Sequence, residues 1–321
     1  MYNSSDGSAA HGLTVGWRVT GATFGILSFV NGFLGNILIL GVLVKDKVIN
    51  VKGKASLISL SVCGLCFTLF LLVAIIDTYV NDRWQYGEVL CHVFTFVNLS
   101  LFGCSMLQQA LIALQRYTCV IFNNKKLIEC PKLLTMNIAF CWVIPPLSMI
   151  PSMYEEFKEY HIDSLGTDCI FLSDTEDFQK ILSFILFIVI PSITIYACYI
   201  RIFMVIKKSG NSVVPHDPYA VHVAPPQSAF IQNREIKLCR MFCVMCAITI
   251  LGYAPFAFLR ALDLAFVVDR GIYVICTALY NIALTSNALI YCLMNKNFSQ
   301  ALRRFWCGSP VTTSNGVTNT N

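Results

Sequence analysis

The chain has 321 residues, of which 56% are hydrophobic and only 13% charged, and its formal net charge is +5. A soluble domain carries about a quarter of its residues as charges, so this composition excludes an ordinary soluble protein and favours a membrane protein. The basic residues gather in alternate loops, which is a membrane-topology pattern and gives no reason to expect a nucleic-acid partner.

Seven apolar stretches follow one another along the chain, separated by short polar loops. In chain order they cover Val19–Val44, Ala55–Thr78, Val89–Phe122, Leu133–Met153, Phe178–Ile206, Lys237–Leu262 and Gly271–Leu293. A helix of about 20 apolar residues crosses the roughly 30 Å hydrocarbon core of a bilayer, and these runs are too long for barrel strands. We therefore predict an all-α, seven-transmembrane helix bundle.

The polar ends complete the predicted domain organisation. We expect an extracellular amino terminus at 1–18, a seven-transmembrane domain at 19–293, and an amphipathic helix with a cytoplasmic tail at 294–321. Residues 1–18 lack the pattern of a signal peptide, so the first apolar stretch is expected to direct insertion. The short eighth helix, Asn297–Trp306, is predicted to lie on the membrane with Phe298, Leu302 and Trp306 facing lipid.

Charge predicts the orientation. With the amino terminus outside, the inner segments hold most of the 23 basic residues and few of the 18 acidic ones. The positive-inside rule then predicts a multi-pass plasma-membrane protein with a cytoplasmic carboxy terminus. Asn3, in Asn3-Ser4-Ser5, becomes a candidate glycosylation acceptor, with an unoccupied site as the open alternative.

Most of the 15 cysteines fall in apolar stretches or on the predicted cytoplasmic side. Only Cys91 and Cys169 face the predicted oxidising side, so we expect a Cys91–Cys169 disulfide that ties a long acidic loop to the bundle. Cys307 follows a basic segment at the membrane surface and is a candidate palmitoylation site; an unmodified thiol is the alternative.

Catalytic and transport patterns are weak. The five histidines are scattered without metal-ligand spacing, and no nucleophile motif or phosphate loop occurs. Ionisable residues in the middle of the apolar stretches, which typify ion pathways, are almost absent. We expect no enzyme, no metal and no other cofactor, and we disfavour a transporter.

Short motifs occur in order along the stretches. They are Gly35-Asn36, Trp84, Ala113-Leu114-Gln115-Arg116-Tyr117, Trp142, Pro191 before Tyr199, Tyr253-Ala254-Pro255-Phe256, and Asn287-Ala288-Leu289-Ile290-Tyr291. Together they resemble the rhodopsin-like class of G-protein-coupled receptors over nearly the whole chain. The resemblance implies a receptor domain at 19–293 that converts ligand binding into activation of a heterotrimeric G protein.

The resemblance also implies roles for single residues. Coupling and activation are expected at Arg116, Tyr117, Tyr199, Glu235, Asn287 and Tyr291. Arg116 is the implied G-protein contact, and the family places an acid beside it where this chain has Gln115. Glu235 is left as the expected partner that holds Arg116 in the closed state. Tyrosines that only anchor the membrane interface are the alternative for Tyr199 and Tyr291.

Other departures from the family pattern lie along the activation core. Gly64 stands where the family has an aspartate, so we expect no sodium-dependent inhibition. Tyr253 replaces a tryptophan, and Ala288 replaces a proline as in melatonin receptors. Altered basal activity and a seven-helix receptor that does not signal both remain open.

The implied ligand pocket is formed by Asn98, Phe102, Tyr253, Phe256, Arg260 and Asn281, with Phe94 and Leu99 as apolar neighbours. The seventh stretch has no lysine for retinal, and Asn98 replaces the aspartate that binds cationic amines. Arg260 shares a helical face with Tyr253 and Phe256, and arginine pairs bidentately with carboxylates, which suits a fatty-acid-like anion. An ion pair of Arg260 with Asp263 or the acidic loop is the alternative.

Within the class, several segments are similar to the medium-chain fatty-acid receptor of immune cells. They include Met1-Tyr2-Asn3-Ser4-Ser5-Asp6 and Asp77-Thr78-Tyr79. This likeness implies inhibitory G proteins and a small lipid-like ligand, with a melatonin-like receptor as the second reading. The Ser/Thr-rich tail after Gly308 is a candidate for arrestin recruitment, and membrane lipids are expected partners of the spans.

Overall fold

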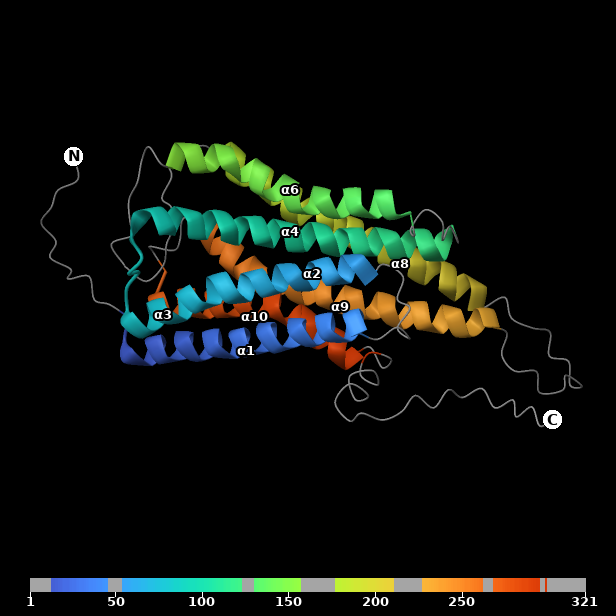
Figure 1. The fold of residues 1–321 in the computed structure, drawn as a ribbon, viewed down its shortest axis with the longest axis horizontal. Helices are drawn as coiled ribbons and strands as arrows, with labels where there is room; N and C mark the ends of the chain where they lie inside the picture. The colour runs from blue at the N-terminus through green and yellow to red at the C-terminus, as the bar shows by residue number, and fades with distance from the viewer. Residues whose placement is uncertain are drawn as a thin grey trace, which may run out of the picture.

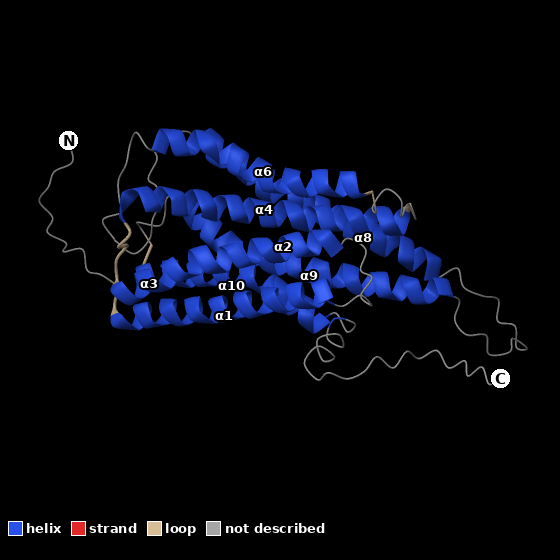
Figure 2. Cartoon of the chain, in the orientation of Figure 1, coloured by secondary structure: helices blue, strands red, loops and turns tan. Residues whose placement is uncertain are grey.

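The structure is a computed structural model that describes residues 13–45, 54–122, 130–156, 177–210, 227–261, 268–294 and Phe298. Every regular element in these ranges is helical (Figure 2). In chain order they are α1 (Val15–Lys45), α2 (Lys54–Cys66), η1 (Phe67–Leu72), α3 (Val73–Asn81), α4 (Gly87–Ile121), α6 (Pro131–Glu156), α7 (Asp177–Phe184), η2 (Ile185–Val189), α8 (Ile190–Gly210), α9 (Gln227–Ala261) and α10 (Arg270–Met294). The predictions at Asn3, Cys169, Cys307, Leu302 and Trp306 fall outside the described residues.

Seven helical segments of the described chain are long and apolar enough to cross a membrane. They are Val15–Val44, Lys54–Asn81, Val89–Ile121, Pro131–Pro151, Ile181–Val205, Arg240–Leu259 and Arg270–Met294. The long helices lie side by side along one common direction (Figure 1). The predicted seven-transmembrane bundle is therefore confirmed.

Two spans that the sequence predicts as continuous α-helix contain a wider, π-helical turn. One is η1 in the second span, and the other is η2, directly before Pro191. Proline has no backbone N–H, so the carbonyl one turn before Pro191 loses its usual donor and the helix changes register there. At η1 the Thr68 hydroxyl donates to the Gly64 carbonyl at 2.7 Å, so a side chain supplements the backbone bonding.

Small residues bring α1 and α10 into close contact. A Cβ atom built on Gly35 would lie 2.7 Å from the Ala288 Cβ atom, and one on Gly32 would lie 2.9 Å from Thr285. At the same level the Asn31 amide donates to the Thr285 hydroxyl at 3.4 Å. Because lipid tails are as apolar as the side chains, helices in membranes gain most from such close packing.

The amino-terminal end of α1 is anchored to the end of α3. The Arg18 guanidinium donates to the carbonyls of Tyr79, at 3.2 Å from Nε, and of Val80. The Leu13 N–H donates to Asp82 at 3.1 Å. The two Arg18 bonds satisfy carbonyls that the end of a helix leaves without partners. They also explain why the helix begins at Val15, earlier than the predicted Val19.

The side chain of Phe298 is buried, with 1% of its surface exposed, and its ring centroid lies 5.2 Å from that of Tyr291. The prediction that Phe298 faces lipid is therefore wrong. Amphipathic spacing indicates which residues share a helical face, but it does not show what that face contacts. Phe298 packs against the Tyr291 ring near the end of α10 and is buried there rather than facing lipid.

We predict that Gly35→Leu destabilises the bundle by about 1–3 kcal/mol, because the new side chain would overlap Ala288. The measurement is the thermal unfolding midpoint of the purified protein. Gly41→Leu is the matched control, since nothing lies within 4 Å of a Cβ atom built on Gly41 in the same helix. Equal midpoints for the two variants would contradict the close α1–α10 contact.

Candidate functional site

Arg116 lies near the end of α4 with only 4% of its surface exposed. Its guanidinium carbon is 6.0 Å from the centroid of the Phe242 ring of α9, within the range of a cation–π contact. A cation inside a membrane bundle is costly unless it is paired or functional. In this arrangement the Arg116 side chain is almost closed off from the surface, with Phe242 of α9 on one side of it.

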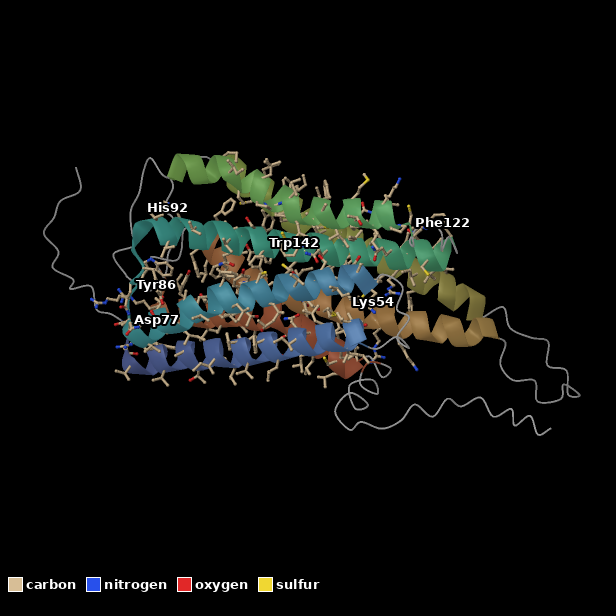
Figure 3. The ribbon with its side chains drawn as sticks, in the orientation of Figure 1. Lys54, Asp77, Tyr86, His92, Phe122 and Trp142 are labelled. Carbon is tan, nitrogen blue, oxygen red and sulfur yellow. The ribbon has the colours of Figure 1, made fainter. Side chains whose placement is uncertain are left out.

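Gln115, beside Arg116, is directed to another helix. Its amide nitrogen donates to the Ser56 hydroxyl of α2 at 2.9 Å. Close to it the Trp142 indole of α6, labelled in Figure 3, donates to the Ser59 hydroxyl at 2.8 Å. The serines of α2 therefore hold both α4 and α6. The Glu235 side chain lies outside the described residues, so its ion pair with Arg116 stays a prediction.

The predicted tyrosine pair is buried close to Arg116. Tyr199 of α8 and Tyr291 of α10 are 3% and 2% exposed, and both belong to the core cluster that includes Phe242. The rings of Phe242 and Tyr291 are 6.4 Å apart, and Tyr117 packs partly buried against the same cluster. Phe242, which the sequence reasoning missed, is thus the residue that joins Arg116 to Tyr291.

Weak polar bonds hold α9 against its neighbours. The Cys246 thiol donates to the Gln109 carbonyl oxygen at 3.2 Å, and the Gln109 amide donates to Ser105 at 3.4 Å. The Thr249 hydroxyl lies 3.4 Å from the Asn287 oxygen of α10. Thiol donors and long hydrogen bonds contribute little each, so these bonds are easily exchanged. Gln109 was missed, although a glutamine in the middle of an apolar stretch is itself a signal.

Four aromatic rings form a cluster in the other half of the bundle, and we call Phe102, Tyr253, Phe256 and Tyr280 the aromatic cluster. Phe102 stacks on Tyr253 with ring centroids 4.1 Å apart, and Phe256 stacks on Tyr280 at 5.1 Å. Tyr253 and Tyr280 are 5.4 Å apart. Helices α4, α9 and α10 therefore meet through these rings, which include three predicted pocket residues.

Asn98 contributes a neutral hydrogen bond to this cluster. The Tyr280 hydroxyl donates to the Asn98 oxygen at 2.7 Å, a contact that the sequence reasoning missed. The neighbouring Asn281 is 2% exposed, and its side-chain oxygen accepts no hydrogen bond within the described part of the chain. Two amide groups thus offer hydrogen bonds, and none of these described pocket side chains carries a charge.

Two other pocket predictions have different outcomes. Leu99 is 40% exposed, so its placement in the pocket is wrong. One residue along a helix is a rotation of about 100°, which turns Leu99 away when Asn98 faces Tyr280. The side chain of Arg260 lies outside the described residues.

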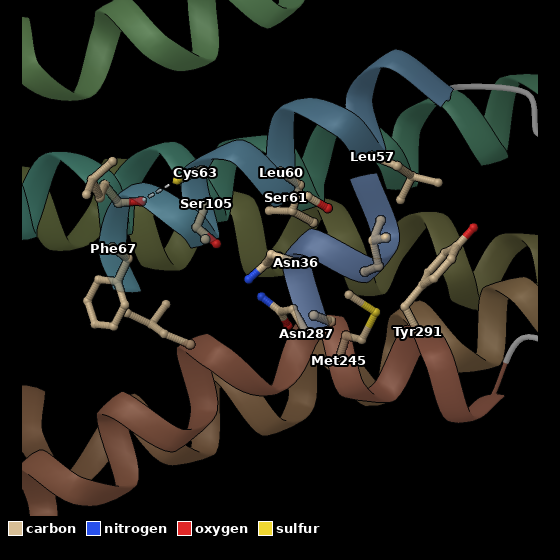
Figure 4. Close-up of a pocket in the computed structure, with 15 residues that line it drawn as sticks. Asn36, Leu57, Leu60, Ser61, Cys63, Phe67, Ser105, Met245, Asn287 and Tyr291 are labelled. Atoms are coloured by element: carbon tan, nitrogen blue, oxygen red, sulfur yellow. Dashed lines mark hydrogen bonds between the residues drawn. The ribbon is translucent and has the colours of Figure 1, made fainter. Parts of the chain in front are cut away.

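Between the surroundings of Arg116 and the aromatic cluster lies a cavity of about 30 Å³ (Figure 4). Its polar lining residues include Asn36, Ser61, Ser105 and Asn287. A Cβ atom built on Gly64 would lie 2.6 Å from the Asn36 amide nitrogen, which donates to the Gly32 carbonyl at 2.7 Å. Asn36 therefore occupies the space that a larger residue at 64 would need, and the lining residues supply no carboxylate for a cation.

Cys91 is disulfide-bonded at the amino-terminal end of α4. The eleven other cysteines that the structure describes carry free thiols, and most of them are buried in the helices. The pairing with Cys169 stays a prediction, because that residue is outside the described ranges.

We predict that exchanging NaCl for KCl at equal ionic strength leaves the thermal unfolding midpoint of the protein unchanged. The cavity beside Gly64 offers neutral oxygens, and a hard cation held there would lack a charged ligand. A rise in the midpoint that is specific to sodium would contradict this expectation.

Comparison with known proteins agrees with this arrangement. The family model described as 7 transmembrane receptor (rhodopsin family) matches residues 35–295. The G-protein coupled receptor moody of Drosophila melanogaster is 28% identical over 197 residues, which is 61% of this chain and 29% of the relative. The chain thus spans less than a third of that relative's length.

Two vertebrate receptors match over more of their length. The 5-hydroxytryptamine receptor 4 of Homo sapiens is 24% identical over 90% of this chain and 80% of its own. The melatonin receptor type 1B of Mus musculus is 22% identical over 85% of this chain and 73% of its own. With the family model covering most of the chain, the protein belongs to the rhodopsin family of seven-transmembrane receptors.

Proposed function

We propose that this receptor responds to a small, largely apolar ligand at the aromatic cluster by moving α9, which uncovers Arg116 for a heterotrimeric G protein. The observation that carries the proposal is the burial of Arg116 beneath Phe242 of α9. The described polar bonds from α9 to Gln109 and Asn287 are weak, so they add little to the free energy that a ligand must supply to shift the helix.

The ligand acts on residues of the same helix. Tyr253 and Phe256 of α9 contact Tyr280 of α10, and Tyr280 donates to Asn98 of α4. A ligand that hydrogen-bonds Asn98 competes with Tyr280 and disturbs the ring stack. Thr249 lies one turn along α9 from Tyr253, so the disturbance reaches the bond to Asn287 directly.

For the ligand itself we propose a medium-chain fatty acid or a similar lipid-like molecule. The described pocket is aromatic and uncharged, and Arg260 follows Tyr253 by about two helical turns on one face of α9. A melatonin-like neutral ligand is the second candidate, supported by the neutral Asn98–Tyr280 pair. The name of the human relative refers to an amine, for which Asn98 offers no counter-ion.

The remaining parts of the proposal concern topology and partners. We propose an extracellular amino terminus and a cytoplasmic tail, supported by the basic residues of the inner segments. Coupling to the inhibitory class of G proteins follows from the resemblance to fatty-acid receptors. Arrestin binding to the Ser/Thr-rich tail, glycosylation of Asn3 and lipidation of Cys307 are further proposals of the same kind.

Arg116→Ala should abolish G-protein activation while surface expression is kept, because the buried guanidinium is the group that α9 uncovers. The measurement is basal and ligand-stimulated activation in cells, against a panel of the G-protein classes. We expect the signal in the inhibitory class. Undiminished activation by the variant would refute the role of Arg116, and silence of both proteins at full surface expression would indicate a receptor that does not signal.

Arg260→Ala should reduce the potency of a medium-chain fatty acid by about tenfold or more, the effect of removing one charged hydrogen-bond partner. The matched variant is Tyr280→Phe, which keeps the ring and removes only the bond to Asn98. A neutral ligand should be affected by Tyr280→Phe and not by Arg260→Ala. Retained fatty-acid potency in the Arg260 variant would exclude the carboxylate contact.

A further inference from the structure

An unusual set of side chains lies where α3 ends and α4 begins. We define the rim corner by Asp77, Arg83, Trp84 and Tyr86; Asp77 and Tyr86 lie close together at the amino-terminal end of the bundle (Figure 3). The second span ends at Asn81 and the third begins at Val89, so the corner sits at the level of the membrane–water interface.

The aromatic rings of the corner are held in place. The Trp84 indole nitrogen donates to the Gly87 carbonyl at 2.8 Å, in a tight turn where Gly87 has a φ of 73°. The Trp84 ring lies 5.1 Å from Tyr86 at an interplanar angle of 71° and 5.2 Å from Phe94. The Trp84 and Tyr86 rings therefore meet edge to face, and Tyr86 is 41% exposed.

The charged groups of the corner are not paired with each other. Asp77 accepts a hydrogen bond from the Asn81 amide at 2.8 Å, and the Tyr86 hydroxyl lies within hydrogen-bonding reach of the same carboxylate. This contact with Asp77 raises the pKa of Tyr86, so Tyr86 is a neutral donor. Arg18 is occupied by the carbonyls of Tyr79 and Val80, and Arg83 is exposed without an ion pair to a described residue.

Exposed apolar side chains flank the corner. Val80 is 54% exposed, Val89 is 65% exposed and Leu90 is 52% exposed, all at the ends of membrane spans. Side chains of this kind face acyl chains. A molecule that reaches the corner from this side therefore presents acyl chains to the three side chains and a polar headgroup to the corner.

The corner offers the Asp77 carboxylate beside the partly exposed Tyr86 ring, together with the separate Arg83 cation. A quaternary ammonium is attracted both to the face of an aromatic ring and to a carboxylate. A guanidinium binds phosphate through paired N–H donors. Phosphocholine is the lipid headgroup that carries both a trimethylammonium and a phosphate.

We propose that the rim corner binds the headgroup of a phosphatidylcholine molecule, with Asp77, Trp84 and Tyr86 holding the trimethylammonium and Arg83 the phosphate. The predicted orientation assigns this lipid to the outer leaflet. The site does not depend on the ligand of the aromatic cluster or on G-protein coupling, so its test measures binding directly. Phe94 connects it to the aromatic cluster, since Phe94 contacts Trp84 and packs against the core that contains Phe102.

The experiment titrates the delipidated full-length receptor with phosphatidylcholine and with phosphatidylglycerol of the same acyl chains. Bound lipid is counted by native mass spectrometry, and the thermal unfolding midpoint is followed in parallel. We expect phosphatidylcholine to bind about fivefold more tightly, the effect of one partly exposed cation–π contact with a carboxylate. Asp77→Asn should bring the ratio of the two lipid affinities close to one. Arg83→Gln should weaken the binding of both lipids to the same extent.

Asp269→Asn is the matched control, because Asp269 is an exposed acid at the same end of the bundle and its oxygen only accepts the Gly271 N–H. It should leave the ratio unchanged. Tyr86→Leu keeps the charge of Asp77 and should lower phosphatidylcholine binding alone, which keeps the test open if the Asp77 variant does not fold. Equal binding of both lipids, or an unchanged ratio in Asp77→Asn, overturns the proposal. If soluble glycerophosphocholine raises the thermal unfolding midpoint as much as phosphatidylcholine does, the proposal that the headgroup belongs to a membrane lipid is overturned.

Discussion

The burial of the Arg116 guanidinium beneath α9 is the constraint on which the rest of this receptor depends. A cation is tolerated inside a membrane bundle only where partners or a functional cavity compensate for its lost hydration. Phe242 provides an aromatic cover and belongs to the same buried cluster as Tyr199 and Tyr291. Because Phe242 belongs to α9, the proposed exposure of Arg116 depends on the position of that helix.

The same helix carries both ends of the proposed signal. Tyr253 and Phe256 belong to the aromatic cluster, and Phe242 lies over Arg116, about 16 Å from Tyr253 along α9 at 1.5 Å per residue. Between them Thr249 and Cys246 make the weak bonds to α10 and α4. Pro255 removes one backbone hydrogen bond within α9, which allows the helix to bend beside the ligand residues.

The departures from the family pattern acquire physical meaning from their neighbours. Gly64 faces the Asn36 amide, so the position has become a packing contact in place of a charge. Gln115 has exchanged an acid for a neutral bond to Ser56, which secures α4 to α2 without holding Arg116. Gln109, which lies in an apolar stretch, connects α4 to α9 through Cys246. The seven-helix architecture accommodates both departures.

The sequence by itself determined the seven spans, because about 20 apolar residues in a row must form a helix across the bilayer, whatever their neighbours are. It also determined the position of Arg116 at the end of a span and the absence of a carboxylate at Gly64. Only the tertiary structure decided which side chains contact one another across the helices. Periodicity shows which residues share a helical face, but Tyr280 with Asn98, and Cys246 with Gln109, lie 182 and 137 residues apart in the chain. Their contacts, like the burial of Phe298 and the exposure of Leu99, follow from how whole helices rotate and pack, which no local pattern encodes.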